Sequence, residues 1–190
     1  IDGIERIRLS SIEPWEISDE LLRAMQNPKV CRHLHIPMQS GDSDTLRRMN
    51  RPYTAEEFIE LTEKVRGAIP KIGITTDIIV GFPGETQEDF ADTLKLLDEV
   101  SYDVAYTFIY SKRSGTPAAK MAEQVPQEIK QERLEKLMAV QNKHSLLHNE
   151  KLVGKTLEVL VEDPSHNNPF VWSGRTDGNK LVLWPKGQDE

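Results

Sequence analysis

The sequence predicts an α/β protein with parallel strands and helices on their outer side, as a barrel or an open sheet, followed by a small antiparallel β module. Strand-like and helix-like segments alternate up to residue 111, which is typical of parallel strands joined by helices. After a long helix the composition changes to short strands separated by Asn, Pro and Gly, which is typical of antiparallel pairing. The module ends after about three strands, too few to close a barrel.

The elements of the alternating part follow from apolar periodicity and from helix caps. Thr54 with Glu57, and Thr86 with Asp89, predict helix starts by their capping-box spacing, and Ser18 predicts a third start. The expected strands are 5–11, 32–39, 72–80 and 103–111, and the expected helices are 18–27, 43–49, 54–70 and 86–100.

The rest of the chain predicts a long amphipathic helix over about 126–150, beginning at Pro126, and then strands at 154–163, 170–177 and 180–186. The helix has a partial apolar stripe of Ile129, Leu134, Leu137, Met138 and Leu146. We expect a first domain over 1–150 and a second over 151–190, and a chain that is a fragment at both ends.

The composition limits the class of protein. Hydrophobic residues make up 37% of the chain, enough for a core, and no apolar run approaches the roughly 20 residues of a membrane span. No leader peptide is recognisable. The net charge of −7 argues against a surface that binds nucleic acid everywhere, but leaves a local basic face open.

Cys31 is the single cysteine. It excludes an internal disulfide, and zinc or iron–sulfur sites cannot be built from the thiols of this chain alone. A lone thiol fits a reducing cytoplasm, and we expect Cys31 to be a small buried side chain.

All four expected strands end in polar or flexible residues, namely SSIEP (10–14), PMQSGD (37–42), GFPGET (81–86) and YSKRSGT (110–116). Turn chemistry explains any one of them. Because the carboxyl ends of parallel strands share one edge, the four together predict a functional site there.

GFPGET offers the best physical rationale. Gly81 and Gly84 lack a Cβ, so a ligand can approach the backbone, and the helix start behind them offers free N–H groups. Glu85 either faces the ligand or favours the helix dipole. Asp77 is expected to point inward, where a carboxylate needs a partner.

Other polar residues at this edge suit a nucleoside-like ligand. Gln39 and Ser40 offer groups for ribose hydroxyls, whereas Lys112 and Arg113 suit a carboxylate or phosphate, unless they form a solvated loop. His33 and His35 share one side of a strand, as a ligand pair or as packed core residues. The i, i+4 pair His144 and His148 lacks a third metal ligand.

Two basic clusters suggest RNA contact through phosphate pairing and base stacking, although either is also compatible with an ordinary surface. One cluster surrounds Tyr53 and the other lies near Trp172. The candidate residues are Arg47, Arg48, Arg51, Tyr53, Lys112, Arg175 and Lys180.

Three motifs, in residues 33–54, 75–86 and 108–121, resemble the radical S-adenosylmethionine methylthiotransferases, and the terminal β module resembles the start of their TRAM domain. The resemblance covers essentially the whole chain. The branch that modifies ribosomal protein usually has Asp and His where this chain has His35 and Ser40, so the tRNA-modifying branch is favoured.

The resemblance implies methylthiolation at C2 of a hypermodified adenosine beside the tRNA anticodon, with S-adenosylmethionine and two [4Fe–4S] clusters. The CxxxCxxC motif is absent and is expected N-terminal to Ile1, so this chain would be the C-terminal half of a radical SAM barrel plus a truncated TRAM domain. We expect no catalytic residue in the chain and no activity without the N-terminal half, and we expect a cytoplasmic monomer.

Carried over by motif, Gln39 and Ser40 would approach the ribose or methionine part of the cofactor. Ile79, Gly81 and Glu85 match the adenine-side strand motif, with Asp77 beside them, and Arg113 would lie near cofactor or substrate. The substrate is either the isopentenyl form, weakly favoured by residues 108–121 and the start of the β module, or the threonylcarbamoyl form, favoured by SSIEP. A non-catalytic RNA-binding module and a radical enzyme with a non-nucleic substrate remain alternatives.

Overall fold

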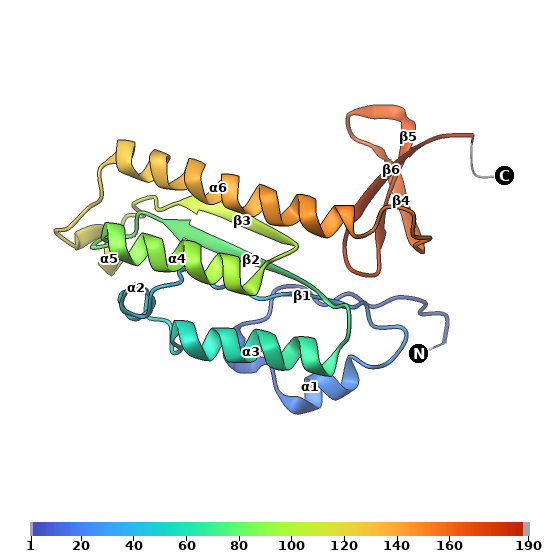
Figure 1. Cartoon of the computed structure of the whole chain (residues 1–190), viewed down its shortest axis with the longest axis horizontal. Coiled ribbons are helices and arrows are strands. Elements are labelled where there is room, and N and C mark those ends of the chain that lie inside the picture. Colours follow the sequence, from blue (N-terminus) through green and yellow to red (C-terminus); the bar gives the residue numbers. More distant parts are fainter. Residues whose placement is uncertain (1, 188–190) are drawn as a thin grey trace.

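The computed structural model describes residues 2–187, which form two three-stranded sheets linked by a long helix (Figure 1). Its strands are β1 (His33–His35), β2 (Gly73–Val80), β3 (Val104–Ile109), β4 (Val159–Ser165), β5 (Asn168–Thr176) and β6 (Leu181–Pro185). Its helices are η1 (Pro14–Glu16), α1 (Asp19–Ala24), α2 (Ser43–Arg48), α3 (Ala55–Ala68), α4 (Gln87–Val100), α5 (Pro117–Lys120) and α6 (Gln127–Glu150).

The first sheet has the order β1-β2-β3, and both pairings are parallel. One face of β2 is closed, because Ile74, Ile78 and Val80 have no exposed surface and belong to the main core. Helices α3, α4 and α6 lie side by side along this sheet (Figure 1). The predicted α/β class, with parallel strands and a partial barrel, is confirmed.

The predicted helix starts agree with the structure. Thr54 and Thr86 cap α3 and α4 with complete capping boxes, and the Ser18 hydroxyl accepts the Leu21 N–H at the start of α1. Each cap satisfies N–H groups that have no partner within the helix.

The first two predicted strands are much shorter than expected, and β4 begins at Val159 instead of at residue 154. Residues 5–11 form only isolated parallel bridges, Ile7 with Val30 and Ser11 with His35, so this segment follows β1 without a continuous ladder. Strand β1 ends at His35 because Pro37 cannot donate a backbone hydrogen bond and Gln39 has a φ of 68°. Gln39 still forms a bridge with Ile78.

The long helix α6 has the predicted length, but only Leu134 and Leu137 of the predicted apolar stripe pack against the core. Ile129, Met138 and Leu146 are exposed. The buried positions are Lys130, Arg133, Leu137, Gln141 and His144, of which four are polar. Their spacing of three or four residues places them on one side of the helix.

Strands β4, β5 and β6 form the predicted antiparallel module, which packs at the amino ends of the parallel strands. Arg8 donates to the carbonyl oxygens of Thr176 and Asp177, and the Asp177 carboxylate accepts the Arg32 N–H at 3.0 Å. The turn between β5 and β6 therefore holds the module against the amino ends of the parallel strands. Within the described part of the chain, none of the helices combines the length and apolar composition that a bilayer crossing requires.

Candidate functional site at the carboxyl ends of the parallel strands

The segments that follow the parallel strands meet at one edge of the sheet, as predicted. Gln39 joins the ends of β1 and β2, because its N–H donates to the Asp77 carbonyl and its carbonyl accepts the Ile79 N–H. The Tyr110 N–H donates to the Val80 carbonyl and joins the ends of β2 and β3. The segment after residue 11 joins the same group through the bond from the Ile12 N–H to the His35 carbonyl.

The sheet face opposite the helices carries a mixture of aromatic and polar side chains. Asp77 is paired in register with Tyr106, and Ile79 with Phe108, so these four side chains share this face. Tyr106 and Phe108 are 49% and 50% exposed, although both are large aromatic residues. We call this surface, with His35, the inward face. It offers stacking surfaces beside a carboxylate and an imidazole.

His35 connects the polar groups of the inward face. Its Nε2 lies 3.4 Å from the Asp77 carboxylate, and its ring centroid lies 5.7 Å from that of Tyr106. Asp77 therefore has the partner that a half-buried carboxylate requires.

Tyr106 and Phe108 are functional candidates that the sequence reasoning missed. Their strand alternates between these residues and Ala105 and Ile109, which pack against the core on the opposite face. That period of two was the available signal, since it places both aromatics on the side of the sheet that carries Asp77.

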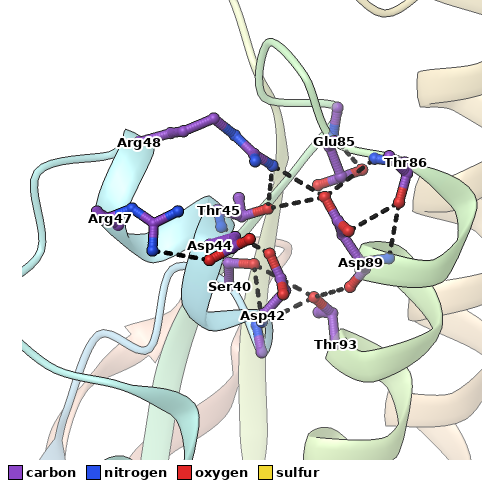
Figure 2. A network of polar contacts seen from close by, with 12 residues as sticks. Ser40, Asp42, Asp44, Thr45, Arg47, Arg48, Glu85, Thr86, Asp89 and Thr93 are labelled. Carbon is purple, nitrogen blue, oxygen red and sulfur yellow. Dashed lines mark hydrogen bonds and ion pairs between the residues drawn. The ribbon is translucent and has the colours of Figure 1, made fainter.

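Ser40 does not face the inward surface but belongs to a polar network that fixes the 38–42 loop onto α4 (Figure 2). Its hydroxyl lies 3.4 Å from the Thr93 hydroxyl, and Ser40 is only 1% exposed. The Gly41 N–H also donates to the Thr93 hydroxyl. The same network continues through Asp89 to Arg48, whose Nη2 lies 2.9 Å from the Asp89 carboxylate.

Glu85 lies at the same edge but is enclosed by protein. Its carboxylate accepts the Gly81 N–H at 2.9 Å and Arg133 Nη1 at 2.6 Å, and the two side chains are 2% and 6% exposed. Burial raises the pKa of Glu85, while the Gly81 N–H and the Arg133 charge oppose that rise. Any influence of Glu85 on a ligand would therefore act through the 81–85 loop.

The space beside Gly81 is occupied by the side chain of Lys130. Gly81 has a φ of +73°, and a Cβ at this position would overlap Lys130 Cγ and lie 2.9 Å from its Cδ. From the sequence, the missing Cβ of Gly81 is expected to leave room for a ligand. The close approach of the Lys130 side chain on α6 explains why a glycine is required at position 81. Ligand contact through the Gly81 backbone stays a prediction.

The predicted basic residues differ in exposure and in pairing. Lys112 and Arg113 are exposed on the loop after β3, where the sequence placed them. Arg47 is largely exposed and paired with Asp44, and Arg51 pairs with Glu13 at 3.0 Å. With Arg48 they lie at or near the carboxyl edge, so a polyanion could reach Arg47, Lys112 and Arg113 without breaking a buried contact.

Three other candidates have internal partners. Tyr53 is buried, and its hydroxyl donates to the carbonyl oxygens of Pro37 and Met38, so its ring is not available at the surface for stacking on RNA. Lys180 pairs with Asp103 at 3.0 Å where the module meets the sheet. Arg175 contacts Asn179 and Glu162 within the module.

His33, His35, His144 and His148 all have hydrogen-bond partners inside the protein. Burial lowers the pKa of His33 to about 4, so His33 is neutral near pH 7, and both His33 and His35 lie 3.0 Å from the Thr75 hydroxyl. His144 and His148 both contact the Ser101 hydroxyl and are not arranged as a pair of metal ligands. Among residues 2–187 no group of three His, Cys, Asp or Glu side chains is arranged to hold a metal ion.

A sequence profile of the Radical SAM superfamily matches residues 1–97. The chain is 54% identical over 96% of its length to tRNA-2-methylthio-N(6)-dimethylallyladenosine synthase of Acetivibrio thermocellus, and it covers 38% of that protein. It is 49% identical to the protein of the same name from Desulfitobacterium hafniense, covering 97% of this chain and 42% of the relative. The chain therefore spans about two fifths of the length of these curated relatives.

Solved structures show the same fold at low sequence identity. Coproporphyrinogen III oxidase of Escherichia coli, described as a radical SAM enzyme, superposes with a TM-score of 0.62 at 18% identity, covering 94% of this chain and 50% of that one. Elp3 of Methanocaldococcus infernus superposes with a TM-score of 0.57 at 12% identity, over 97% of this chain and 54% of that one. In both cases the chain corresponds to about half of a larger protein.

Proposed function

The chain belongs to the radical SAM superfamily, and we propose that it is part of a tRNA methylthiotransferase. Its reaction would add a methylthio group to C2 of N6-dimethylallyladenosine beside the anticodon. The observation that carries the proposal is the 54% identity to a synthase of that name over 96% of this chain, which includes all the segments of the carboxyl edge. The dimethylallyl substrate is favoured over the threonylcarbamoyl one for the same reason.

The residues at the carboxyl edge fit S-adenosylmethionine, which supplies hydrogen abstraction and methyl transfer in this superfamily. Ile79 on the inward face offers an apolar surface for the adenine, and the Gly81 backbone adjoins it. The backbone of Gln39 is fixed by its two hydrogen bonds to β2, so it needs little ordering on binding. Arg113 is exposed at the end of β3 and would pair with a carboxylate or phosphate.

The same chain does not fit an iron–sulfur cluster. Cys31 is its single thiol, and that side chain is buried at the amino end of the sheet, where its N–H donates to the Ile7 carbonyl. A [4Fe–4S] cluster requires several thiolates. Two clusters would therefore be held by thiols outside these 190 residues.

The substrate would be held by the inward face and by the basic loops around it. The half-exposed rings of Tyr106 and Phe108 provide stacking and apolar surface for a modified adenine, beside the Asp77 carboxylate. Arg47, Lys112 and Arg113 would neutralise phosphates of the anticodon loop, which gives the acidic chain a local basic face. A protein of this kind would act in the cytoplasm, together with the N-terminal half of the same polypeptide.

The test is mass spectrometry of tRNA nucleosides from cells that lack the full-length gene. We expect the methylthio form to disappear and its N6-dimethylallyl precursor to accumulate. Accumulation of a threonylcarbamoyl precursor would overturn the substrate, and an unchanged nucleoside profile would support a non-catalytic module. Complementation with Arg113→Ala should fail, whereas Arg23→Ala, an exposed residue on α1, should restore the product.

A further inference from the structure

Helix α6 contacts the loop after β2 through side chains that neither the sequence motifs nor the relatives' names assign. The buried positions of α6 begin with Lys130 and Arg133, one turn apart. Buried Lys and Arg are rare in proteins unless they are paired. Both reach the 81–85 loop, the segment proposed to adjoin the cofactor.

Arg133 holds the loop at two points. Its Nη1 donates to the Glu85 carboxylate at 2.6 Å and to the Glu85 backbone carbonyl at 3.0 Å. The same carboxylate accepts the Gly81 N–H, so the two ends of the loop are tied together through one buried ion pair. Removing one partner of such a pair leaves an uncompensated charge in the interior.

Lys130 fixes the other side of Gly81. Its aliphatic stem fills the space that a Cβ of Gly81 would occupy. Its ammonium donates to the Tyr110 carbonyl at 3.1 Å and lies 5.2 Å from the centroid of the Tyr110 ring. Phe82 packs edge-on against that ring, so Lys130 joins the segments that follow β2 and β3.

We propose that Arg133 and Lys130 are positioning residues of the cofactor site, because together they fix the backbone of the 81–85 loop from the side that faces α6. Neither residue is assigned contact with the reacting atoms. The inference rests on the proposed function, since it takes this loop to be the adenine-side wall. Its specific consequence is that α6 sets cofactor affinity through Gly81 and Glu85.

The test uses the cluster-reconstituted full-length protein with Arg133→Lys. Lysine keeps the charge, but its side chain is one bond shorter, so its ammonium cannot take the position from which Arg133 Nη1 donates to both the carboxylate and the carbonyl of Glu85. We expect the affinity for S-adenosylhomocysteine, measured by titration calorimetry, to fall about tenfold, with a raised KM for S-adenosylmethionine and a nearly unchanged kcat. Hydrogen exchange should accelerate in the peptide that contains Gly81, with other peptides unaffected.

Two further variants make the result specific. Glu85→Gln with Arg133→Met removes both charges together and should bind S-adenosylhomocysteine better than Arg133→Met alone. Lys136→Met is the control, because it breaks an exposed i, i+4 pair with Glu132 on the same helix, and it should change neither affinity nor exchange.

An unchanged affinity and an unchanged Gly81 exchange rate in Arg133→Lys would overturn the proposal. So would exchange that accelerates equally throughout β2, α4 and α6, because that result assigns Arg133 to general folding. Formation of the methylthio nucleoside by the wild-type protein is measured in a separate assay. Its absence would reject the proposed function, while local loosening of the loop would still be observable.

Discussion

The explanation of Gly81 by the side chain of Lys130 predicts the outcome of a double-mutant cycle. Gly81→Ala places a Cβ where the structure has Lys130 Cγ, an atom close to the backbone of α6 that cannot swing away freely. The left-handed backbone at φ +73° costs an alanine about 1 kcal/mol, and overpacking adds about 1–3 kcal/mol. The free energy of unfolding should therefore fall by about 2–4 kcal/mol.

The second mutation of the cycle is Lys130→Ala, which removes the overlapping stem. In that background Gly81→Ala should cost only the backbone share, about 1 kcal/mol, so the coupling between the two positions is about 1–3 kcal/mol. Urea unfolding of the four proteins, followed by tryptophan fluorescence, measures it. An equal cost of Gly81→Ala in both backgrounds would refute the steric explanation and return the glycine to a ligand role.

The remaining predictions concern side chains whose partners are internal. Tyr53→Phe leaves the Pro37 carbonyl without its donor, and the Met38 carbonyl keeps only the Ser40 N–H. The variant should lower the free energy of unfolding by about 1–3 kcal/mol, with tRNA affinity unchanged; weaker tRNA binding by the folded variant would contradict this assignment. The pKa of His33 is lowered from 6.5 to about 4, so only the unfolded chain binds this proton between those values, and stability should fall by up to about 3 kcal/mol as the pH drops through that range. Urea midpoints of His33→Gln across the same range should depend less on pH, and an identical dependence would exclude His33 as the cause. Lys180→Met should accelerate hydrogen exchange in the turn between β5 and β6 without lowering tRNA affinity, because its ammonium pairs with Asp103; a lower affinity would return Lys180 to the RNA surface.

Local rules account for the parts of the fold that the sequence predicted. The capping boxes at Thr54 and Thr86 and the apolar β2 strand depend on neighbours within a few residues, and all three are present. The ladder at residues 5–11 depends on distant partners. There the Arg6 and Arg8 side chains turn to the β module, and only isolated bridges to the chain beside β1 form.

The buried side of α6, which packs against the sheet and the 81–85 loop, was the least predictable part of the candidate site. Hydrophobic periodicity favoured a face containing Met138 and Leu146, yet the buried face contains Arg133 and Gln141. A polar side chain is stable in the interior only if a partner is provided. The partners are the Glu85 carboxylate and the Tyr102 carbonyl, which lie about 40 or more residues away in sequence and cannot be identified from the helix itself.

The position of the β module constrains how an RNA substrate would be held. The module contacts the amino ends of the parallel strands, whereas the proposed cofactor loops follow their carboxyl ends, and Figure 1 shows the two at opposite ends of the sheet. Strand β2 has eight residues and therefore separates them by about 26 Å. An RNA that contacts both would run along the inward face past Tyr106, so Tyr106→Ala should weaken tRNA binding even when the module is deleted. If the effect of Tyr106→Ala required the module, the RNA would follow a different surface.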